Sequence, residues 1–417
     1  MTALRTSSIS DAISRLPRGA HVVAAPGMGA PSTLVAEIGR RADDQGWTLS
    51  SGLFLDEYPF LDAVVEGRLS YRTWHVMPPV RKAVAAGLVE YLPVRASRLA
   101  HLLSRWSPDV ALVRVGPPDP RGYCSLGASA GYGRPAVRNA RIVIAEVDPS
   151  VPRTFGETML HHSEIDILVE SATPVPLYRA AVGDELTRLI AQHVRTLLPR
   201  ELTLQIGVGG VPESLIRSLG EDPSGIDSMR IVGMATDDMV DLFASGLLRH
   251  SDVVPEPAIL SPDMMATQRL LEFAHQNPSI GMYSSAVAHD PYSLGRRERF
   301  YSVNTALEVD LSGNVNSEVM RGEQLSGPGG SLDYVDAATR SCGGRRIIAL
   351  PSTTSDGSRS RIVPRLDHVT IPRSMTDVVV TEYGVAELEG RSLAERARLL
   401  IEIAHPDQRS LLAETLR

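Results

Sequence analysis

Short apolar runs rich in β-branched residues alternate with longer amphipathic stretches along the whole chain, and this alternation constrains the fold most strongly. Residues on both faces of each run are apolar, which is typical of parallel strands covered by helices on both sides. The pattern predicts an α/β protein whose sheets are mostly parallel. The clearest runs lie at 21–25, 110–115, 141–147, 202–208, 346–350 and 377–381.

One arrangement occurs twice. Residues 21–38 and 202–219 each read as a strand, a Gly-x-Gly turn, a proline and a helix with one apolar stripe. Proline is favourable early in a helix because its missing N–H has no partner there. A chain of 417 residues is also longer than one compact core ordinarily supports. We therefore predict two related α/β domains, 1–189 and 190–417.

The composition excludes several classes of protein. The net charge of −7 leaves no general basic character for binding nucleic acid. The chain has no apolar run of about 18 residues, and its N-terminus lacks the apolar core of a signal peptide. The chain has only two cysteines, Cys124 and Cys342, and they lie far apart in the sequence. This usage indicates free thiols in a reducing compartment. We expect a cytoplasmic protein that binds neither nucleic acid nor membrane.

Two glycine-rich turns are candidates for ligand binding. At the turn 207–210 a backbone without Cβ atoms can approach a ligand, and the helix that follows directs free N–H groups at it. The turn 327–330 can aim consecutive N–H donors at one point, as an oxyanion hole requires. The alternatives are a structural strand-to-helix connection and a surface turn. The glycines concerned are Gly207, Gly209, Gly210, Gly327, Gly329 and Gly330.

Glu382 is a further candidate because it follows the apolar strand 377–380. Ligands of open α/β sheets gather at the carboxyl ends of strands. The alternative is a cap or an ion-pair partner. None of the histidines has the spacing of a metal site, so no metal is expected.

Several segments, in order along the chain, resemble the acetyl-CoA hydrolase/CoA-transferase family, which includes the 4-hydroxybutyrate CoA-transferases. The strongest is VVVTEYGVAELEGRSLAERARLLIEIAHPDQR, residues 378–409. The resemblance implies two CoA-transferase-type domains and coenzyme A as substrate. The other segments are 118–129, 142–170, 204–215, 304–318 and 327–335.

The family's mechanism, as the resemblance implies it, uses a glutamate that attacks the acyl-CoA and becomes a glutamyl-CoA thioester. In this chain the segment 231–242 matches the motif that carries this glutamate, and Gly233 occupies the glutamate's position. Asp237 and Asp238 lie close by, where they are expected to cap the helix 239–243. His289 stands in the family's Asn-His-Pro motif, here His289–Asp290–Pro291. It either serves as a general base or merely fills space.

Three functions are compatible with this pattern. The first is an enzyme that acts on acyl-CoA or an acyl carrier thioester by direct acyl transfer or hydrolysis, with a small-molecule acceptor. The second is an ordinary acyl-CoA:carboxylate CoA-transferase that uses another acid. The third is a non-catalytic acyl-CoA-binding protein. For the assembly, a homodimer is the working hypothesis.

Overall fold

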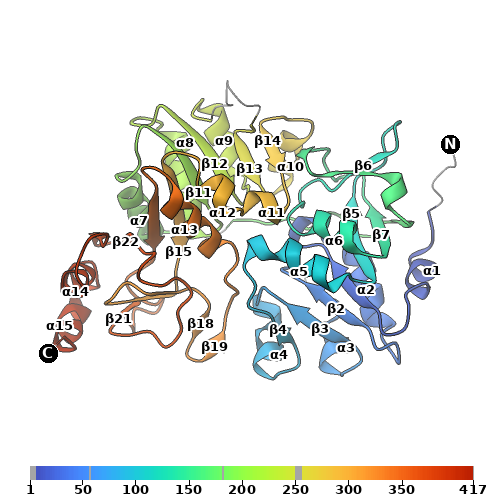
Figure 1. Cartoon of the computed structure of the whole chain (residues 1–417), viewed down its shortest axis with the longest axis horizontal. Helices are drawn as coiled ribbons and strands as arrows, with labels where there is room; N and C mark the ends of the chain where they lie inside the picture. The colour runs from blue at the N-terminus through green and yellow to red at the C-terminus, as the bar shows by residue number, and fades with distance from the viewer. Residues whose placement is uncertain (1–5, 56–57, 181–182, 249–255, 417) are drawn as a thin grey trace. The chain divides into compact units, whose positions relative to one another are not determined.

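The computed structural model describes residues 6–55, 58–180, 183–248 and 256–416. The chain divides into two compact units (Figure 1). The first comprises Met1–Arg179, Val253–Ala288 and Glu323–Gly329, and the second Ala180–Asp252, His289–Gly322 and Gly330–Arg417. The first unit thus includes two segments from the second half of the chain. A single boundary along the sequence would not produce these two units. The boundary between two related halves at 189/190 stays a prediction.

The first unit is built on a seven-stranded sheet in which every pair of neighbours is parallel. In sheet order its strands are β10 (Ile167–Glu170), β7 (Ile142–Val147), β5 (Val110–Val115), β1 (His21–Ala24), β2 (Thr48–Ser51), β3 (Ser70–Thr73) and β4 (Glu90–Tyr91). Its main helices are α1 (Ile9–Ser14), α2 (Ser32–Arg40), α3 (Leu61–Val65), α4 (Arg81–Ala85), α5 (Leu99–Trp106) and α6 (Gly133–Asn139).

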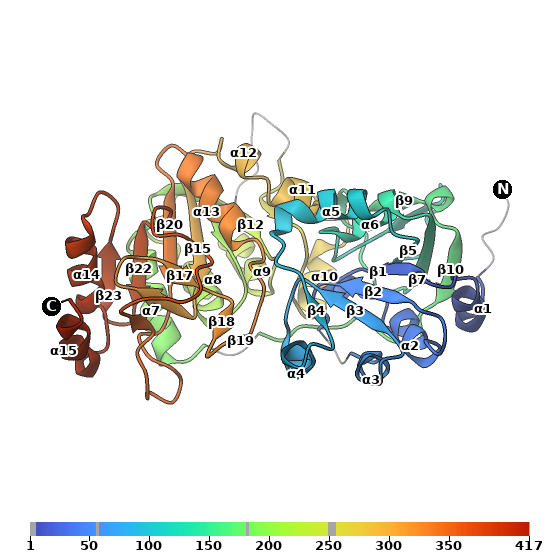
Figure 2. The ribbon, with the colours of Figure 1, turned by 60° about the horizontal axis from the view of Figure 1, so that its bottom comes forward.

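Helices cover both faces of this sheet, with α2, α3 and α4 on one side and α5 and α6 on the other (Figure 2). The alternation of side chains along β1 explains this. Val22 packs with Leu34 of α2 in one apolar cluster, whereas Val23 packs with Leu103 of α5 in another. Because successive side chains of a strand point to opposite faces, an apolar strand needs cover on both. The α/β prediction is confirmed.

Shorter elements complete the first unit. Strands β13, β14 and β8 pair in parallel, and β6 pairs antiparallel with β9. These elements are β6 (Tyr123–Ser125), β8 (Phe155–Gly156), β9 (Met159–His161), β13 (Ile259–Ser261), α10 (Gln268–Ala274), β14 (Ile280–Met282), α11 (Ser285–Ala288) and β19 (Glu323–Gln324).

Six strands of the second unit lie side by side in the order β23-β22-β20-β15-β11-β12, all parallel except the edge strand β23. They are β23 (Gly384–Glu387), β22 (Val378–Thr381), β20 (Arg345–Ala349), β15 (Phe300–Thr305), β11 (Glu201–Ile206) and β12 (Ser228–Gly233). The remaining elements are α7 (Glu185–Arg195), α8 (Gly210–Glu221), α9 (Asp238–Ala244), α12 (Pro291–Leu294), β16 (Glu308–Asp310), β17 (Val315–Asn316), β18 (Val319–Met320), α13 (Ser331–Arg340), β21 (Ile362–Val363), α14 (Leu393–Glu402) and α15 (Pro406–Glu414).

The two sheets share one topological feature, which confirms the repeated arrangement as a structural one. In the first sheet the order of the strands reverses between β1 and β5, and in the second it reverses between β11 and β15. Strands β1 and β11 each lead into a glycine-containing turn and a helix. The apolar stripes of both helices are buried as predicted. Such reversal points form crevices at the carboxyl ends of the strands, where α/β proteins bind ligands. The sheet topology therefore directs attention to the two turns.

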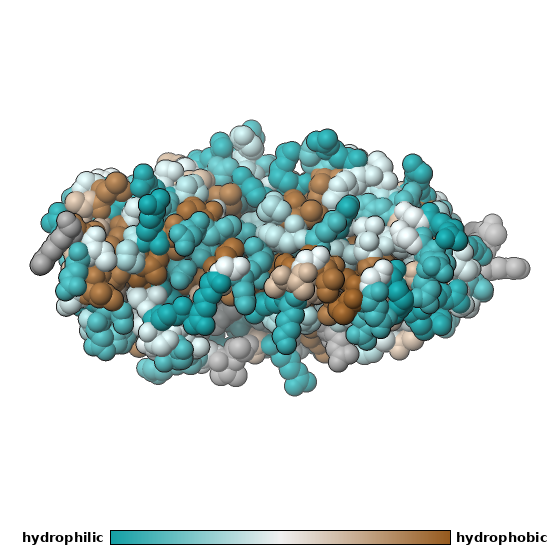
Figure 3. Space-filling model, turned by 90° about the horizontal axis from the view of Figure 1, so that it is seen from below, coloured by the Kyte–Doolittle hydropathy of each residue, from teal (hydrophilic) through white to brown (hydrophobic). Residues whose placement is uncertain are grey.

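Polar and apolar residues are interspersed on the face shown in Figure 3. The large apolar side chains with the greatest exposure, Tyr292, Leu411 and Leu393, belong to three different helices. The aromatic residues Phe54, Tyr58, Phe60, Tyr71 and Trp74 are buried, so core packing accounts for that group. Scattered apolar side chains of this kind are normal on a protein surface and indicate no binding patch.

Candidate functional site

The carboxyl-end edge of the second unit's sheet holds most of the predicted site residues. The turn with Gly207, Gly209 and Gly210 follows β11, Gly233 ends β12, and Glu382 follows β22. Because these strands are parallel, their carboxyl ends lie along one edge. The predicted residues are therefore on the same edge, although not all are neighbours.

Gly233 lies directly beside the end of β11, where it pairs with Ile206 in the parallel ladder. Its φ of +121° is a conformation that residues other than glycine rarely adopt. A Cβ atom built at Gly233 would stand 2.1 Å from the carbonyl oxygen of Ile206. That oxygen is backbone within a sheet and cannot move aside cheaply. Position 233 therefore has no space for a side chain unless the backbone moves.

Glu213 supplies a carboxyl group close to the turn after β11, and the sequence did not single it out. It lies in the first turns of α8, is 2% exposed, and one of its oxygens accepts a hydrogen bond of 3.3 Å from the N–H of Gly209. The other oxygen is buried and has no hydrogen-bond partner among the described residues. Burial raises the pKa of Glu213, which favours the protonated, hydrogen-bond-donating form.

His289 packs against the second glycine-rich turn. The histidine is 7% exposed, and its ring lies 4.8 Å, centroid to centroid, from the ring of Tyr334 in α13. A Cβ atom at Gly330 would stand 2.3 Å from Cδ2 of His289, so the absence of a side chain there lets the imidazole approach the backbone. Among the described residues, the N–H group of Gly330 has no protein acceptor. The structure thus brings His289 and Gly330 together.

Gly327 and Gly329 lie in the first unit, against the residues that follow β3. A Cβ atom at Gly327 would stand 2.2 Å from the carbonyl oxygen of Trp74, and one at Gly329 would stand 3.7 Å from Nε2 of His75. Nδ1 of His75 is buried and has no hydrogen-bond partner among the described residues. Burial lowers the pKa of His75 to about 4. The sequence carried no signal for His75, since it has no motif spacing and its position follows from the strand order.

The burial of His75 predicts a specific pH dependence of stability. The pKa of about 4 in the folded state lies below the ordinary value of 6.5. Between these two pH values the unfolded chain therefore binds a proton at His75 that the folded chain does not bind. The free energy of unfolding should fall as pH drops from about 6.5 to about 4, by up to ~1.4 kcal/mol per pH unit from this residue. Urea denaturation of native protein and H75Q between pH 7.5 and 4.5 measures it. H405Q is the control, and a native-minus-H75Q difference that does not change with pH would contradict the prediction.

Glu382 is placed apart from Gly233. Its carboxylate accepts hydrogen bonds from the N–H (2.9 Å) and the hydroxyl (2.5 Å) of Ser352, which follows β20. Four strand spacings separate β22 from β12 in the sheet, roughly 19 Å at about 4.8 Å each. Glu382 therefore ties two strand ends together and does not lie beside Gly233.

The expected capping by aspartates is only partly right. Asp237 occupies the N-cap position of α9, but its side chain makes no capping hydrogen bond. Asp238 lies within the helix and pairs with Arg217 at 3.2 Å. The capping box of Ser392 and Glu395 at α14 is confirmed.

The described ranges offer no cluster of metal ligands and no candidate membrane span. No group of three or more His, Cys, Asp or Glu side chains that could hold a metal ion occurs among them. None of their helices combines the length and apolar character that a bilayer crossing requires. Cys124 is buried, which raises the pKa of its thiol to about 11, and Cys342 is exposed; neither forms a disulfide.

Comparison with known proteins matches both halves of the chain to one family. Residues 5–178 match the acetyl-CoA hydrolase/transferase N-terminal domain, and residues 266–416 match the C-terminal domain of the same family. The chain is 34% identical to a 4-hydroxybutyrate coenzyme A transferase of Clostridium kluyveri over 410 residues, covering 96% of this chain and 94% of the relative.

Two solved structures share the fold over nearly the whole length. The crystal structure of RipA from Yersinia pestis is 29% identical, with a TM-score of 0.90, and covers 99% of this chain and 96% of its own. A 4-hydroxybutyrate CoA-transferase from Porphyromonas gingivalis is 29% identical, with a TM-score of 0.78, and covers 99% and 97%. The sequence resemblance is thus confirmed at the level of the family. The chain belongs to the acetyl-CoA hydrolase/transferase family and is an enzyme of the transferase or hydrolase class.

Proposed function

We propose that this enzyme binds an acyl-CoA, or an acyl carrier thioester, and processes it by direct acyl transfer or hydrolysis without a glutamyl-CoA intermediate. The observation that carries the proposal is Gly233, whose backbone leaves no space for a carboxylate side chain. The names of the relatives support a CoA thioester as substrate. A glycine cannot form the thioester with the enzyme that the family's mechanism requires.

In this mechanism water or another small-molecule acceptor attacks the thioester carbonyl. His289 takes the proton of the attacking group as general base. Negative charge develops on the carbonyl oxygen, and the N–H groups of the glycine-rich turn 327–330 stabilise it. The C–S bond then breaks, the CoA thiolate takes up a proton, and the acyl group leaves as acid or ester. Among the described residues the N–H groups of Gly329 and Gly330 have no protein acceptor, which supports this role.

A trapping experiment tests the absence of a covalent intermediate. The enzyme is incubated with acetyl-CoA, treated with borohydride or hydroxylamine, digested and analysed by mass spectrometry. We expect turnover of the thioester with no modified glutamate or aspartate. A modified acid would refute the proposal, and tight binding of acetyl-CoA with no loss of the acyl group over hours would instead support a non-catalytic binder.

The role of His289 predicts a loss of turnover on substitution. H289Q should lower kcat by roughly 10²–10⁴-fold, because glutamine cannot accept the proton at neutral pH. H405Q serves as the control, since His405 caps α15 through the N–H of Asp407. The rate at which free CoA thiol is released from acetyl-CoA gives kcat for both variants. A kcat for H289Q within about twofold of the native value would leave His289 a packing role.

A second candidate function, an ordinary CoA-transferase with another acid, is favoured by Glu213 alone. Its carboxyl group is buried beside the turn after β11, and one oxygen has no partner among the described residues. Burial raises the pKa of this carboxyl group, a direction that disfavours the ionised form that acts as nucleophile. Exchange of CoA between acetyl-CoA and free carboxylates, abolished in E213Q and accompanied by a trapped thioester at Glu213, would establish this function.

Location and assembly belong to the same proposal. We place the enzyme in the cytoplasm, because Cys124 and Cys342 are free thiols, as a reducing compartment keeps them. A homodimer is the working hypothesis for the assembly, and size-exclusion chromatography with light scattering tests it. The acceptor is a small molecule, and coenzyme A takes part as substrate without a metal ion.

A further inference from the structure

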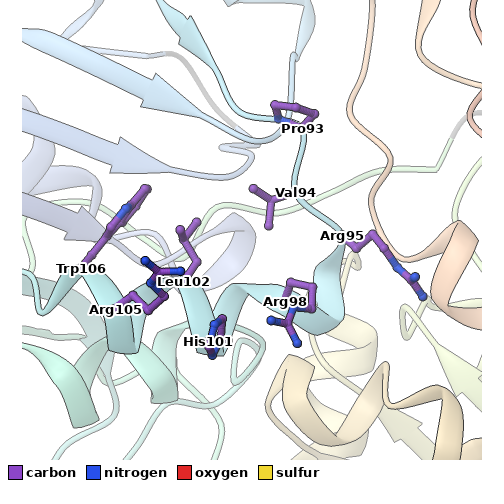
Figure 4. Close-up of a pocket in the computed structure, with 8 residues that line it drawn as sticks. All are labelled: Pro93, Val94, Arg95, Arg98, His101, Leu102, Arg105 and Trp106. Carbon is purple, nitrogen blue, oxygen red and sulfur yellow. The ribbon is translucent and has the colours of Figure 1, made fainter.

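A basic pocket lies in the first unit. One wall is helix α5, and the other is the segment 93–95 that precedes it (Figure 4). Its volume of about 570 Å³ is within the range of small-molecule sites, roughly 300–1,000 Å³. Its principal lining residues are Arg95, Arg98, His101, Leu102, Arg105 and Trp106, and we call this site the α5 pocket.

The basic side chains of the α5 pocket share one face of the helix. Arg98, His101 and Arg105 are spaced three and four residues apart, which places them above one another. The opposite face is apolar and buried, through Leu99 and Leu103. Arg98, His101 and Arg105 are all exposed. The basic face is therefore directed away from the core, toward the pocket.

Two of these arginines lack the partners that other helical arginines have. Arg40 pairs with Glu37 and Arg340 with Asp336 on their own helices. Within the described ranges neither Arg98 nor Arg105 forms an ion pair or a side-chain hydrogen bond. Helix α5 also has no acidic residue in its first turn. No carboxylate among the described residues therefore neutralises the positive charge of Arg98 and Arg105.

This arrangement is unfavourable for the isolated helix. Arg98 and Arg105 carry like charges two turns apart on one face of the helix, and Arg98 stands at the N-cap, the positive end of the helix dipole. The chain as a whole is acidic, with a net charge of −7. A local cluster of basic side chains on one helix is therefore not explained by the overall composition. An anion bound in the pocket would remove both penalties. The charge pattern therefore indicates an anionic ligand.

Trp106 adds an aromatic surface at the end of the same helix (Figure 4). Its ring is held by His21 at 4.8 Å and by Trp74 at 6.5 Å between centroids. Leu102 stands beside it on the pocket side of α5. A fixed, half-buried indole offers a flat surface on which a heterocyclic base can stack. Arginines for phosphate and an indole for a base together fit a nucleotide.

We propose that the α5 pocket binds a phosphorylated nucleoside, with Arg98 and Arg105 on its phosphates and the base against Trp106. Two sources share this chemistry: the adenosine 3′,5′-diphosphate end of an acyl-CoA, and a free nucleotide that acts as a ligand in its own right. The first source rests on the proposed function, whereas the binding itself does not.

Binding of free adenosine 3′,5′-diphosphate to the full chain tests the proposal without any turnover. Isothermal titration at low salt should show binding that weakens as ionic strength rises. The double variant R98A/R105A should bind more weakly by roughly tenfold for each arginine removed. R121A/R141A is the matched control, because it removes the same charge from side chains that are 84% and 77% exposed elsewhere on the unit.

Competition by acetyl-CoA separates the two sources. If acetyl-CoA displaces the nucleotide, and R98A/R105A raises KM for acetyl-CoA but not for acetyl-pantetheine, the pocket holds the substrate's nucleotide end. If the nucleotide binds without competition, the pocket serves a free nucleotide. Native protein that does not bind it at millimolar concentration, or equal affinity in R98A/R105A, would overturn the proposal, whatever the protein does with thioesters. The melting temperature of R98A/R105A should not fall, since the two substitutions relieve repulsion.

Discussion

Replacing Gly233 by alanine should lower the free energy of unfolding by about 3–5 kcal/mol, or prevent folding of the second unit. Two penalties combine. The φ of +121° disfavours any residue with a Cβ atom, and that atom would stand 2.1 Å from the carbonyl oxygen of Ile206. Relief of the contact would require β11 and β12 to separate at a point where they pair in register. Urea denaturation followed by circular dichroism measures the loss.

Gly246 provides the matched control for this experiment. Its φ of +80° is also in the left-handed region, but nothing lies within 4 Å of a Cβ atom built there. G246A should therefore cost only about 1 kcal/mol, the backbone penalty without the clash. Equal losses in G233A and G246A would show that β12 relaxes easily, and the contact with Ile206 would then not exclude a side chain.

The same geometry predicts the outcome of restoring the family's glutamate. G233E should not gain CoA exchange between acetyl-CoA and a free carboxylate. A glutamate side chain at this position can be accommodated only if the backbone of β11 or β12 moves. Exchange is measured by mass spectrometry of the CoA esters. A folded G233E variant with ping-pong exchange kinetics would show that only the nucleophile is missing from an otherwise ordinary transferase.

Loss of Arg114 should be the second large effect, with R114M less stable by about 3–5 kcal/mol. Arg114 is fully buried in β5 and lies 3.0 Å from Glu146 and 2.6 Å from Asp148. It also donates to the carbonyl oxygens of Ala30 and Thr173, at 2.9 and 2.8 Å. Methionine fills a similar volume but leaves two buried carboxylates without their cation.

Graded variants separate charge from geometry at this position. R114K keeps the charge but loses the planar fork, so its loss of stability should be smaller than that of R114M. Adding E146Q and D148N to R114M should recover part of the loss, because the uncompensated charges are removed. R121M is the surface control, since Arg121 is 84% exposed. Thermal denaturation of R114M indistinguishable from native would show that the buried carboxylates do not need their cation.

The local elements were predictable because their signals are local. The apolar runs form strands close to their predicted bounds, as with β5 and β7. The stripe in α8 is buried, and the capping box begins α14. Family membership was also readable, since motifs such as 378–409 keep residue types and order. These features depend on spacing within one short segment.

The site could be predicted only in part. The motif match points to Gly233 as the altered position, yet its closed surroundings depend on the register with β11, a separate strand. Glu382 follows a strand as predicted, but the order of the strands separates it from Gly233. Neither Glu213 nor His75 was predictable: Glu213 lies in the family-like segment 204–215, but only its burial in the fold marks it out, and His75 belongs to no motif.

The sequence by itself determined the α/β class, the repeated strand–turn–helix units and the family, and its motif match predicts Gly233 in place of the family's glutamate. Those properties follow from residue types at short spacing. Only the tertiary structure decided that no side chain fits at Gly233, that His289 meets Gly330, and that the cations of α5 line a pocket beside Trp106. Each depends on which distant segments pack together, and packing is a property of the whole fold rather than of any segment.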